Sequence, residues 1–169
     1  AHLALGRTIF PAGTTGEQLN AIAHRPLWQE YCDFGHGTGH GVGSYLCVHE
    51  GPQCIGGAIT RVPLEPGMLL SNEPGLYLVG QYGIRIENVC CVKEAGQAAE
   101  GFAGCGPFYR FEDLTLVPYN LSLIAEAELS IEEKQWVNEY HQRVYDTMSV
   151  MLSADENAWL AEKTAALSL

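Results

Sequence analysis

The stretch HGTGHGVGSYLCVHEGP, residues 36–52, brings three histidines within fourteen residues: His36, His40 and His49. Glycine alternates through its first half, at positions 37, 39, 41 and 43. Because glycine has no Cβ, another backbone or a ligand can approach this segment closely. A lone histidine is more often a hydrogen-bonded structural residue than a ligand, so the three gain meaning only together with other residues.

These glycines do not form a nucleotide-binding loop. The pattern G-x-G-x-x-G, started at Gly37, fails because its third glycine position holds Val42, and no strand–glycine–helix context surrounds it. The G-K-[ST] sequence of a phosphate-binding loop is also missing. The segment therefore indicates chemistry other than phosphate binding.

Two glutamates further along the chain change the interpretation. Glu73 lies in NEPG, where proline and glycine are expected to end a strand, and Glu87 lies in GIRIEN. A period of two puts Arg85 and Glu87 on one face of that strand, and unpaired buried charge is costly. One imidazole and two carboxylates from separate strands suit Mn²⁺, Co²⁺ or Zn²⁺. An ordinary salt bridge within the sheet is the alternative reading.

The surrounding pattern predicts an α+β fold. Short apolar runs between glycine and proline predict strands at residues 45–48, 68–70, 84–92 and 114–117. Capping boxes at Thr15 and Ser130 predict two helices, the second running to about residue 151, and a short helix is expected at about residues 157–166. Without any internal repeat, residues 1–169 are predicted to form one unit, with residues 119–169 as a helical C-terminal tail.

Composition limits the partners. A net charge of -11 argues against nucleic acid, and no apolar run reaches the roughly 18 residues of a membrane span. The six cysteines form no C-x-x-C pair, which predicts free thiols in a reducing, cytoplasmic compartment. The first residues contain neither methionine nor a signal-peptide pattern, so we expect the chain to come from a longer protein.

Five segments carry a family resemblance: GHGTGHGVG (35–43), VHEGP (48–52), NEPG (72–75), GIRIENV (83–89) and FEDLTLVP (111–118). In this order and spacing they resemble the pita-bread metallopeptidases, and within them the aminopeptidase P (Xaa-Pro aminopeptidase) family. WVNEYH, residues 136–141, extends the likeness over essentially the whole chain. The resemblance implies the C-terminal half of a pita-bread domain: a curved, mainly antiparallel sheet flanked by helices, with the 130–151 helix packed on it.

The resemblance also implies a metal centre. In that family two metal ions, usually Mn²⁺, share five protein ligands. Matched by motif, His40 corresponds to the histidine ligand, Glu73 to a glutamate on one metal, and Glu87 to the bridging glutamate. Zn²⁺ or Co²⁺ are the other ions such ligands suit.

The implied reaction is hydrolysis of the bond before proline at a peptide N-terminus, so the partners are peptides with proline at the second position. The metals activate water, and Glu73 is the best placed residue to take its proton. His49 resembles a histidine that contacts substrate and assists proton movement, and His36 resembles a substrate-pocket histidine. Arg85 resembles an arginine that orients the carboxylates.

The sequence departs from the family in one respect. The family places two aspartate ligands and a further histidine upstream of the helix that starts at Thr15, but the first aspartate here is Asp33. We therefore expect an active whole protein, whereas these 169 residues alone are inactive and bind metal weakly or not at all. Uncovered strand edges and apolar surface also predict self-association as a homodimer.

Other readings are possible. A pita-bread protein can be a non-catalytic binding module, but such a module has no need of His40, His49, Glu73 and Glu87 together. A thiol hydrolase using Cys47 and His49 lacks a residue to orient the imidazole. Methionine aminopeptidases and prolidases use similar ligands, whereas HGTGHGVGS, VHEGP and FEDLTLVP favour aminopeptidase P.

Overall fold

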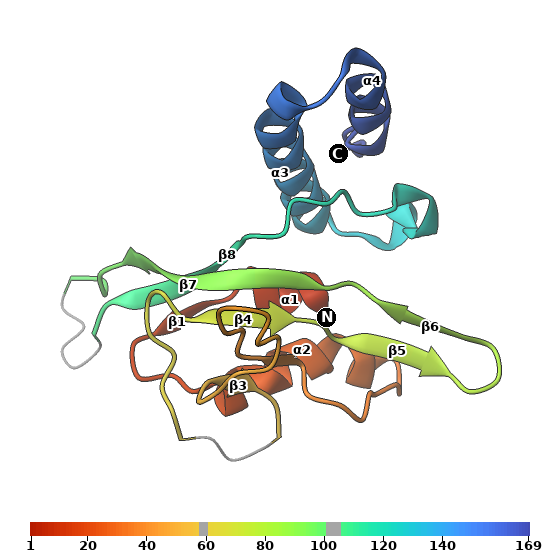
Figure 1. Cartoon of the computed structure of the whole chain (residues 1–169). Coiled ribbons are helices and arrows are strands. Elements are labelled where there is room, and N and C mark those ends of the chain that lie inside the picture. The colour runs from red at the N-terminus through yellow and green to blue at the C-terminus, as the bar shows by residue number, and fades with distance from the viewer. Residues whose placement is uncertain (58–60, 101–105) are drawn as a thin grey trace. The chain divides into compact units, whose positions relative to one another are not determined.

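The computed structural model describes residues 1–57, 61–100 and 106–169, which form two compact units, Ala1–Thr115 and Leu116–Leu169. The first unit contains a four-stranded sheet in the order β1 (Ile9–Pro11), β8 (Phe108–Asp113), β7 (Asn88–Gly96) and β4 (Leu69–Asn72) (Figure 1). Two further ladders pair β2 (Gly39–His40) with β3 (Cys54–Ile55), and β5 (Gly75–Leu78) with β6 (Tyr82–Arg85). All of these pairings are antiparallel, as predicted.

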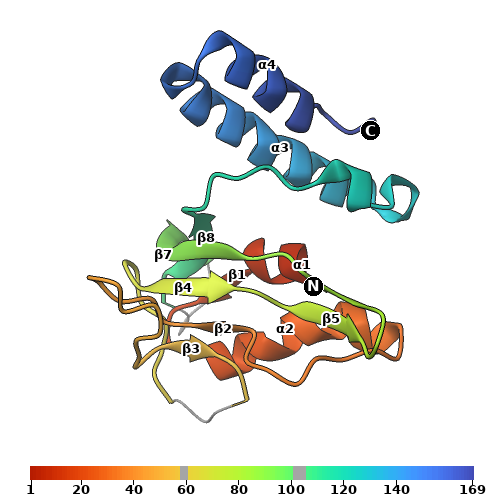
Figure 2. The same ribbon diagram turned by 45° about the vertical axis from the view of Figure 1, so that its right-hand side comes forward.

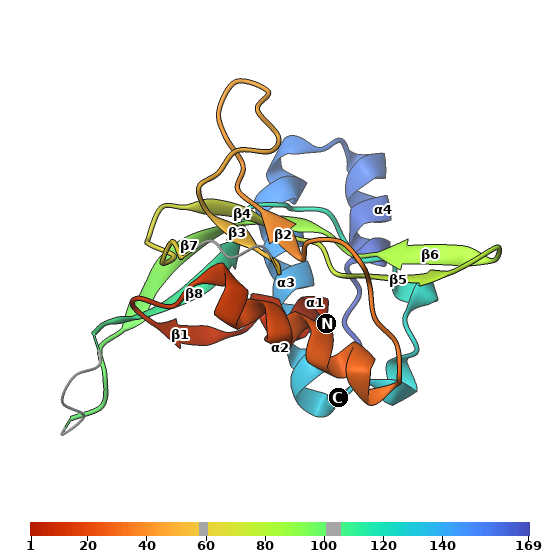
Figure 3. The ribbon, with the colours of Figure 1, turned by 90° about the horizontal axis from the view of Figure 1, so that it is seen from below.

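Two helices cover one face of this sheet, α1 (His2–Gly6) and α2 (Gly16–Gln29) (Figure 3). The capping box at Thr15 is confirmed, and Pro26 stays inside α2 instead of ending it. The core lies between the helices and the sheet and contains Leu5, Phe10, Leu19, Ala23, Ile55, Leu64, Leu70, Cys90, Val92 and Phe111. This packing holds β2 and β4 in place, the strands that carry the candidate site.

The predicted strand at residues 84–92 is interrupted at Ile86–Glu87. β4 and β5 are likewise separated by Glu73–Pro74. Asn72 pairs with Asn88 before the break and Gly75 pairs with Arg85 after it, so both strands skip two residues in one continuous register. Pro74 has no N–H to donate, which prevents an unbroken ladder. The β5–β6 hairpin therefore extends beyond the sheet (Figure 2).

Two other predicted strands are wrong. Residues 45–48 form an exposed turn, in which Tyr45 and Leu46 have φ of 56° and 67°. Left-handed backbone cannot continue a strand, whatever the apolar pattern suggests. Residues 114–117 follow the end of β8 and have no strand conformation.

The second unit is helical. It contains α3 (Ile131–Met148), α4 (Ala154–Lys163) and three short 3₁₀ turns, at Leu121–Leu123, Glu126–Glu128 and Ser149–Met151. The capping box at Ser130 is confirmed, and α4 starts earlier than predicted because Ser153 and Glu156 form another one. Tyr140, Val144 and Leu160 are the centre of its core. The boundary at residue 119 and the packing of α3 on the sheet stay predictions.

Two expectations from composition can be compared with the structure. In the described ranges no helix is both long and apolar enough to cross a membrane. Cys32, Cys47, Cys90 and Cys91 are free thiols, as predicted, whereas Cys105 lies outside the described residues.

Candidate metal centre

Glycine allows β2 to lie unusually close to its neighbours. A Cβ on Gly39 would lie 1.9 Å from the carbonyl oxygen of Ser71 in β4, and one on Gly41 would lie 1.9 Å from that of Glu50. No side chain fits in such a gap. The close backbone approach predicted for this glycine pattern is confirmed, and it places His40 beside the end of β4.

The His40 ring is held in one orientation. Its Nδ1 lies 3.0 Å from the carbonyl oxygen of Gly41, which can only accept, so Nδ1 carries the hydrogen and the neutral ring has its lone pair on Nε2. That Nε2 lies 3.2 Å from Glu73 Oε1. Two electron-pair donors directed at one place are suited to hold a cation between them.

Glu73 is 8% exposed and its carboxylate is fixed from two sides. The Ser71 hydroxyl donates to Oε1 at 2.8 Å, and Arg85 Nη1 donates to Oε2 at 2.9 Å. Ser71 Oγ also accepts the backbone N–H of His40 at 2.9 Å. One hydroxyl therefore sets the relative position of both candidate ligands.

His36 joins the same network through Tyr77. His36 Nδ1 lies 2.8 Å from the Gly37 carbonyl oxygen, so its Nε2 accepts from the Tyr77 hydroxyl at 2.7 Å. Arg85 donates to the same hydroxyl from Nε at 2.9 Å and from Nη2 at 2.7 Å. These hydrogen bonds to the Tyr77 hydroxyl raise the pKa of Arg85, and the charges of Glu73 and Glu87 raise it further.

Tyr77 lies flat on its own hairpin. A Cβ on Gly75 would meet the Tyr77 hydroxyl at 2.3 Å, and one on Gly83 would meet Cδ1 of the ring at 2.8 Å. Gly83 is also the cross-strand partner of Tyr77. The two glycines therefore make the surface on which the ring rests, and they keep its hydroxyl between His36 and Arg85.

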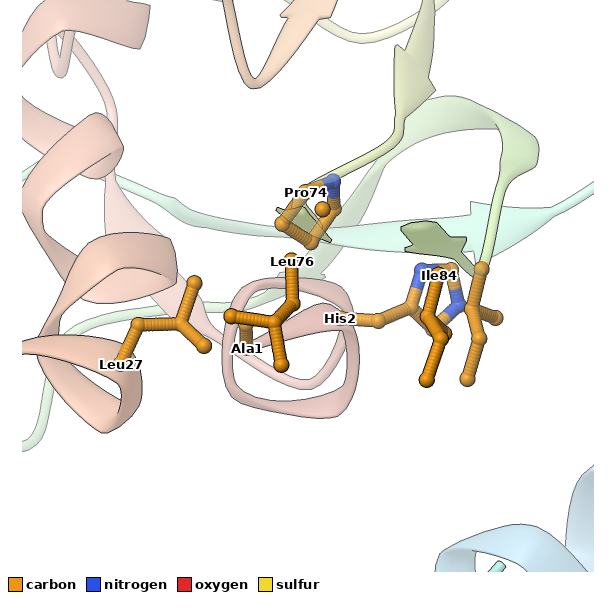
Figure 4. A pocket seen from close by; sticks show the side chains of 8 residues that line it. Ala1, His2, Leu27, Pro74, Leu76 and Ile84 are labelled. Atoms are coloured by element: carbon orange, nitrogen blue, oxygen red, sulfur yellow. The ribbon is translucent and has the colours of Figure 1, made fainter. Parts of the chain in front are cut away.

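The opposite side of the hairpin borders an apolar hollow of about 160 Å³. Leu76 and Ile84 form a cross-strand pair there, and the hollow is also lined by Leu27 of α2 and by Ala1 and His2 (Figure 4). Alternation along the hairpin thus separates an apolar side, which lines this hollow, from the polar side that carries Tyr77 and Arg85.

His49 stands next to His40, with ring centroids 4.2 Å apart and an interplanar angle of 60°. It is exposed and belongs to the turn-rich segment between β2 and β3. The structure therefore brings together five predicted residues: His36, His40, His49, Glu73 and Arg85.

Glu87 is less closely joined to this set. Its side chain is exposed, and the register across the β4–β5 and β6–β7 breaks places it opposite Glu73. Facing carboxylates repel each other unless a cation lies between them. In the part of the chain that the structure describes, no three His, Cys, Asp or Glu side chains gather as a metal site. The predicted convergence is thus seen for His40 and Glu73, and the role of Glu87 stays a prediction.

Ser71 and Tyr77 were missed by the sequence reasoning. Ser71 is two residues before Glu73 in LLSNEPG, and a period of two would have placed both side chains on one face. Tyr77 gave no such signal, because its position over Gly83 depends on the register of a hairpin that the sequence does not show.

Comparison with known proteins agrees with the family resemblance seen in the sequence. Residues 1–94 match metallopeptidase family M24, and residues 107–167 match the C-terminal region of peptidase M24. A probable Xaa-Pro aminopeptidase P from Sclerotinia sclerotiorum is 48% identical over 163 residues, covering 94% of this chain and 27% of the relative. Aminopeptidase P1 from Arabidopsis thaliana is 42% identical and covers 99% of this chain and 26% of the relative.

A solved structure agrees in fold. X-prolyl aminopeptidase from Caenorhabditis elegans, described as a cytosolic enzyme with a di-nuclear active site, matches with a TM-score of 0.88 at 40% identity. The match covers 98% of this chain and 27% of that one, and the pita-bread fold is confirmed. This chain spans about a quarter of the length of the relatives it matches.

Proposed function

The chain belongs to metallopeptidase family M24, and on that premise we propose that the whole protein is an Xaa-Pro aminopeptidase, to which this chain contributes part of a dinuclear metal centre. The observation that carries the proposal is the pair of His40 Nε2 and Glu73 Oε1, 3.2 Å apart and each fixed by further hydrogen bonds. Such fixed ligand orientation is typical of metal sites.

The ligands from this chain are His40, Glu73 and Glu87, and Mn²⁺ is the ion we propose, with Zn²⁺ or Co²⁺ as substitutes. A nitrogen and two carboxylates fit such borderline divalent ions. When bound, the ions supply Lewis-acid activation of water and of the substrate carbonyl. The remaining ligands come from residues outside these 169.

Side chains of this chain carry out proton transfer, hold the Glu73 carboxylate and contact the substrate. Glu73 accepts the proton of the attacking water, and Arg85 and Ser71 hold its carboxylate in position. His49, exposed beside His40, contacts the substrate and relays a proton near the scissile bond. His36 lies in a cavity of about 550 Å³ that also borders His40, and it contacts the bound peptide.

The names of the relatives support the proposed substrate class and location. Their names support peptides with proline at the second position, cleaved before that proline. The cytosolic description of the Caenorhabditis elegans enzyme supports a cytoplasmic location. We also propose a homodimer, and light scattering that shows a monomer across a wide concentration range would contradict it.

The 169-residue chain by itself is proposed to be inactive. Among its acidic residues the family resemblance supplies no match for the two aspartate ligands. A centre without them cannot hold both ions, and His49 alone cannot lower the pKa of water from about 15.7 toward 7 as a metal does.

The test is release of the N-terminal residue from an Xaa-Pro peptide with Mn²⁺ in excess, measured for the whole protein and for this chain. The proposal predicts turnover by the whole protein only, and much slower cleavage of a matched Xaa-Ala peptide. Peptide binding without turnover by the whole protein would instead favour a non-catalytic binding module. Comparable turnover by this chain would refute the claim that it is inactive.

A further inference from the structure

A histidine–aspartate pair lies one layer behind the candidate site. His24 of α2 is 7% exposed, and its Nδ1 lies 2.5 Å from Asp33 Oδ1. The same carboxylate oxygen accepts the backbone N–H of Phe34 at 2.9 Å. The hydrogen bond from His24, followed by those from Phe34 and the Trp28 side chain, lowers the pKa of Asp33. Asp33 therefore links the end of α2 to the segment that leads into His36.

This pair fixes an aromatic platform. The His24 ring stacks on the ring of Phe34, with centroids 4.0 Å apart and planes 12° from parallel. Phe34 is itself 6% exposed, and beyond it lies the His36 ring, with centroids 4.9 Å apart. Because Asp33 holds Nδ1 of His24, that ring cannot rotate freely about its Cβ–Cγ bond, so Phe34 packs on a fixed surface.

His36 needs such support because its own backbone offers little. It lies between Gly35 and Gly37, neither of which has a side chain to restrict the segment. Its Nε2 must nevertheless stay within hydrogen-bond distance of the Tyr77 hydroxyl, which connects it to Arg85 and Glu73. Phe34 is an aromatic neighbour of the same ring.

We infer that Asp33 and His24 are positioning residues: through Phe34 they hold His36 at its place in the substrate cavity. Neither is among the metal ligands or the residues proposed to touch the reacting atoms. The inference rests on the proposed function, since it assigns these two residues a task within the same reaction.

A double-mutant cycle on kcat/KM in the whole protein tests it, with an Xaa-Pro peptide and Mn²⁺. We expect Asp33→Ala to lower kcat/KM about tenfold, since a small misplacement of a positioned group is costly. In a His36→Ala background the same substitution should change nothing further, because its only route of action is gone. If the two losses multiply, Asp33 acts independently of His36 and the inference is wrong.

Two further variants guard against misfolding. Asp33→Asn keeps an acceptor for the Phe34 N–H and the His24 Nδ1–H, and it should restore most of the activity. His24→Phe keeps the aromatic stack but removes the hydrogen bond with Asp33. Its kcat/KM should therefore fall as far as that of Asp33→Ala, and combining the two substitutions should lower kcat/KM no further. Glu30→Gln, which neutralises an exposed carboxylate three residues from Asp33, is the matched control and should equal wild type.

A readout besides activity separates this inference from the proposed function. In the ¹⁵N spectrum of the whole protein, His36 should show one tautomer, protonated at Nδ1, and Asp33→Ala should make it average between forms. Unchanged His36 signals in Asp33→Ala would overturn the inference even if the enzyme is active. A wild-type protein that cleaves no Xaa-Pro peptide would overturn the proposed function, and the spectra would still decide the role of Asp33.

Discussion

At the scale of single residues, the candidate centre depends on hydrogen bonds that orient the ligands before any ion binds. His40 is fixed through Nδ1 and its backbone N–H, and Glu73 through both carboxylate oxygens. Ser71 takes part in both sets. Pre-orientation of this kind lowers the conformational entropy lost on metal binding, and it explains why a buried serine lies beside two candidate ligands.

Ser71→Ala tests that dependence. Ser71 is 1% exposed, and its loss leaves the His40 N–H and Glu73 Oε1 without this partner in a largely buried place. We expect the free energy of unfolding to fall by about 1–3 kcal/mol in urea titrations. Ser44→Ala, at an exposed position in the turn-rich segment between β2 and β3, should leave it unchanged. Equal stability of the two variants would show that Ser71 has no such role.

At the scale of elements, the site lies where two antiparallel ladders meet end to end. The β4–β7 ladder and the β5–β6 ladder keep one register across a break of two residues. Glu73 lies in this break on one side and Glu87 on the other. A break frees the two carboxylates from the regular alternation of a sheet. Both can then turn toward a common ligand.

Local pattern predicted part of this arrangement. Capping boxes identified the starts of α2 and α3, and the glycines around His40 indicated close backbone contact. Pro74 and Gly75 also predicted the strand end at Glu73, whereas the matching interruption at Ile86–Glu87 could not be predicted, because it depends on which residues lie opposite that segment across the sheet. The turn at Tyr45 was mistaken for a strand because an apolar run looks the same in either backbone conformation.

Gly83→Ala tests the hairpin's role in holding Tyr77. The added Cβ would lie 2.8 Å from the Tyr77 ring, which must then shift and release its hydroxyl from His36 and Arg85. We expect kcat/KM of the whole protein to fall about tenfold. Gly96→Ala, where a Cβ meets nothing within 4 Å, should retain wild-type activity. A crystal structure of Gly83→Ala with the Tyr77–His36 hydrogen bond intact would contradict this explanation.

At the scale of the whole molecule, the candidate ligands all belong to the first unit, Ala1–Thr115. The second unit carries its own helical core. The family resemblance implies five ligands for a dinuclear centre, two more than the three proposed here. We therefore expect this chain to contribute part of the complete site, and its folded stability decides whether that contribution is in place.

That stability should depend on pH through His2. Burial lowers the pKa of His2 to about 4, whereas the unfolded chain has an ordinary value near 6.5. Between those values the unfolded state binds more protons, so stability is fully present above about pH 6.5 and is lost as the pH falls. By pH 5 the loss should reach about 2 kcal/mol. Urea midpoints at pH 7.5 and 5 should differ more for wild type than for His2→Gln, and equal differences would contradict the assignment to His2.

Anomalous scattering from crystals of the whole protein soaked in Mn²⁺ can show whether His40, Glu73 and Glu87 are ligands of a dinuclear centre. We expect two manganese peaks that have His40, Glu73 and Glu87 among their ligands. Peaks coordinated by other residues, or manganese sites that leave Glu73 and Glu87 uncoordinated, would contradict it.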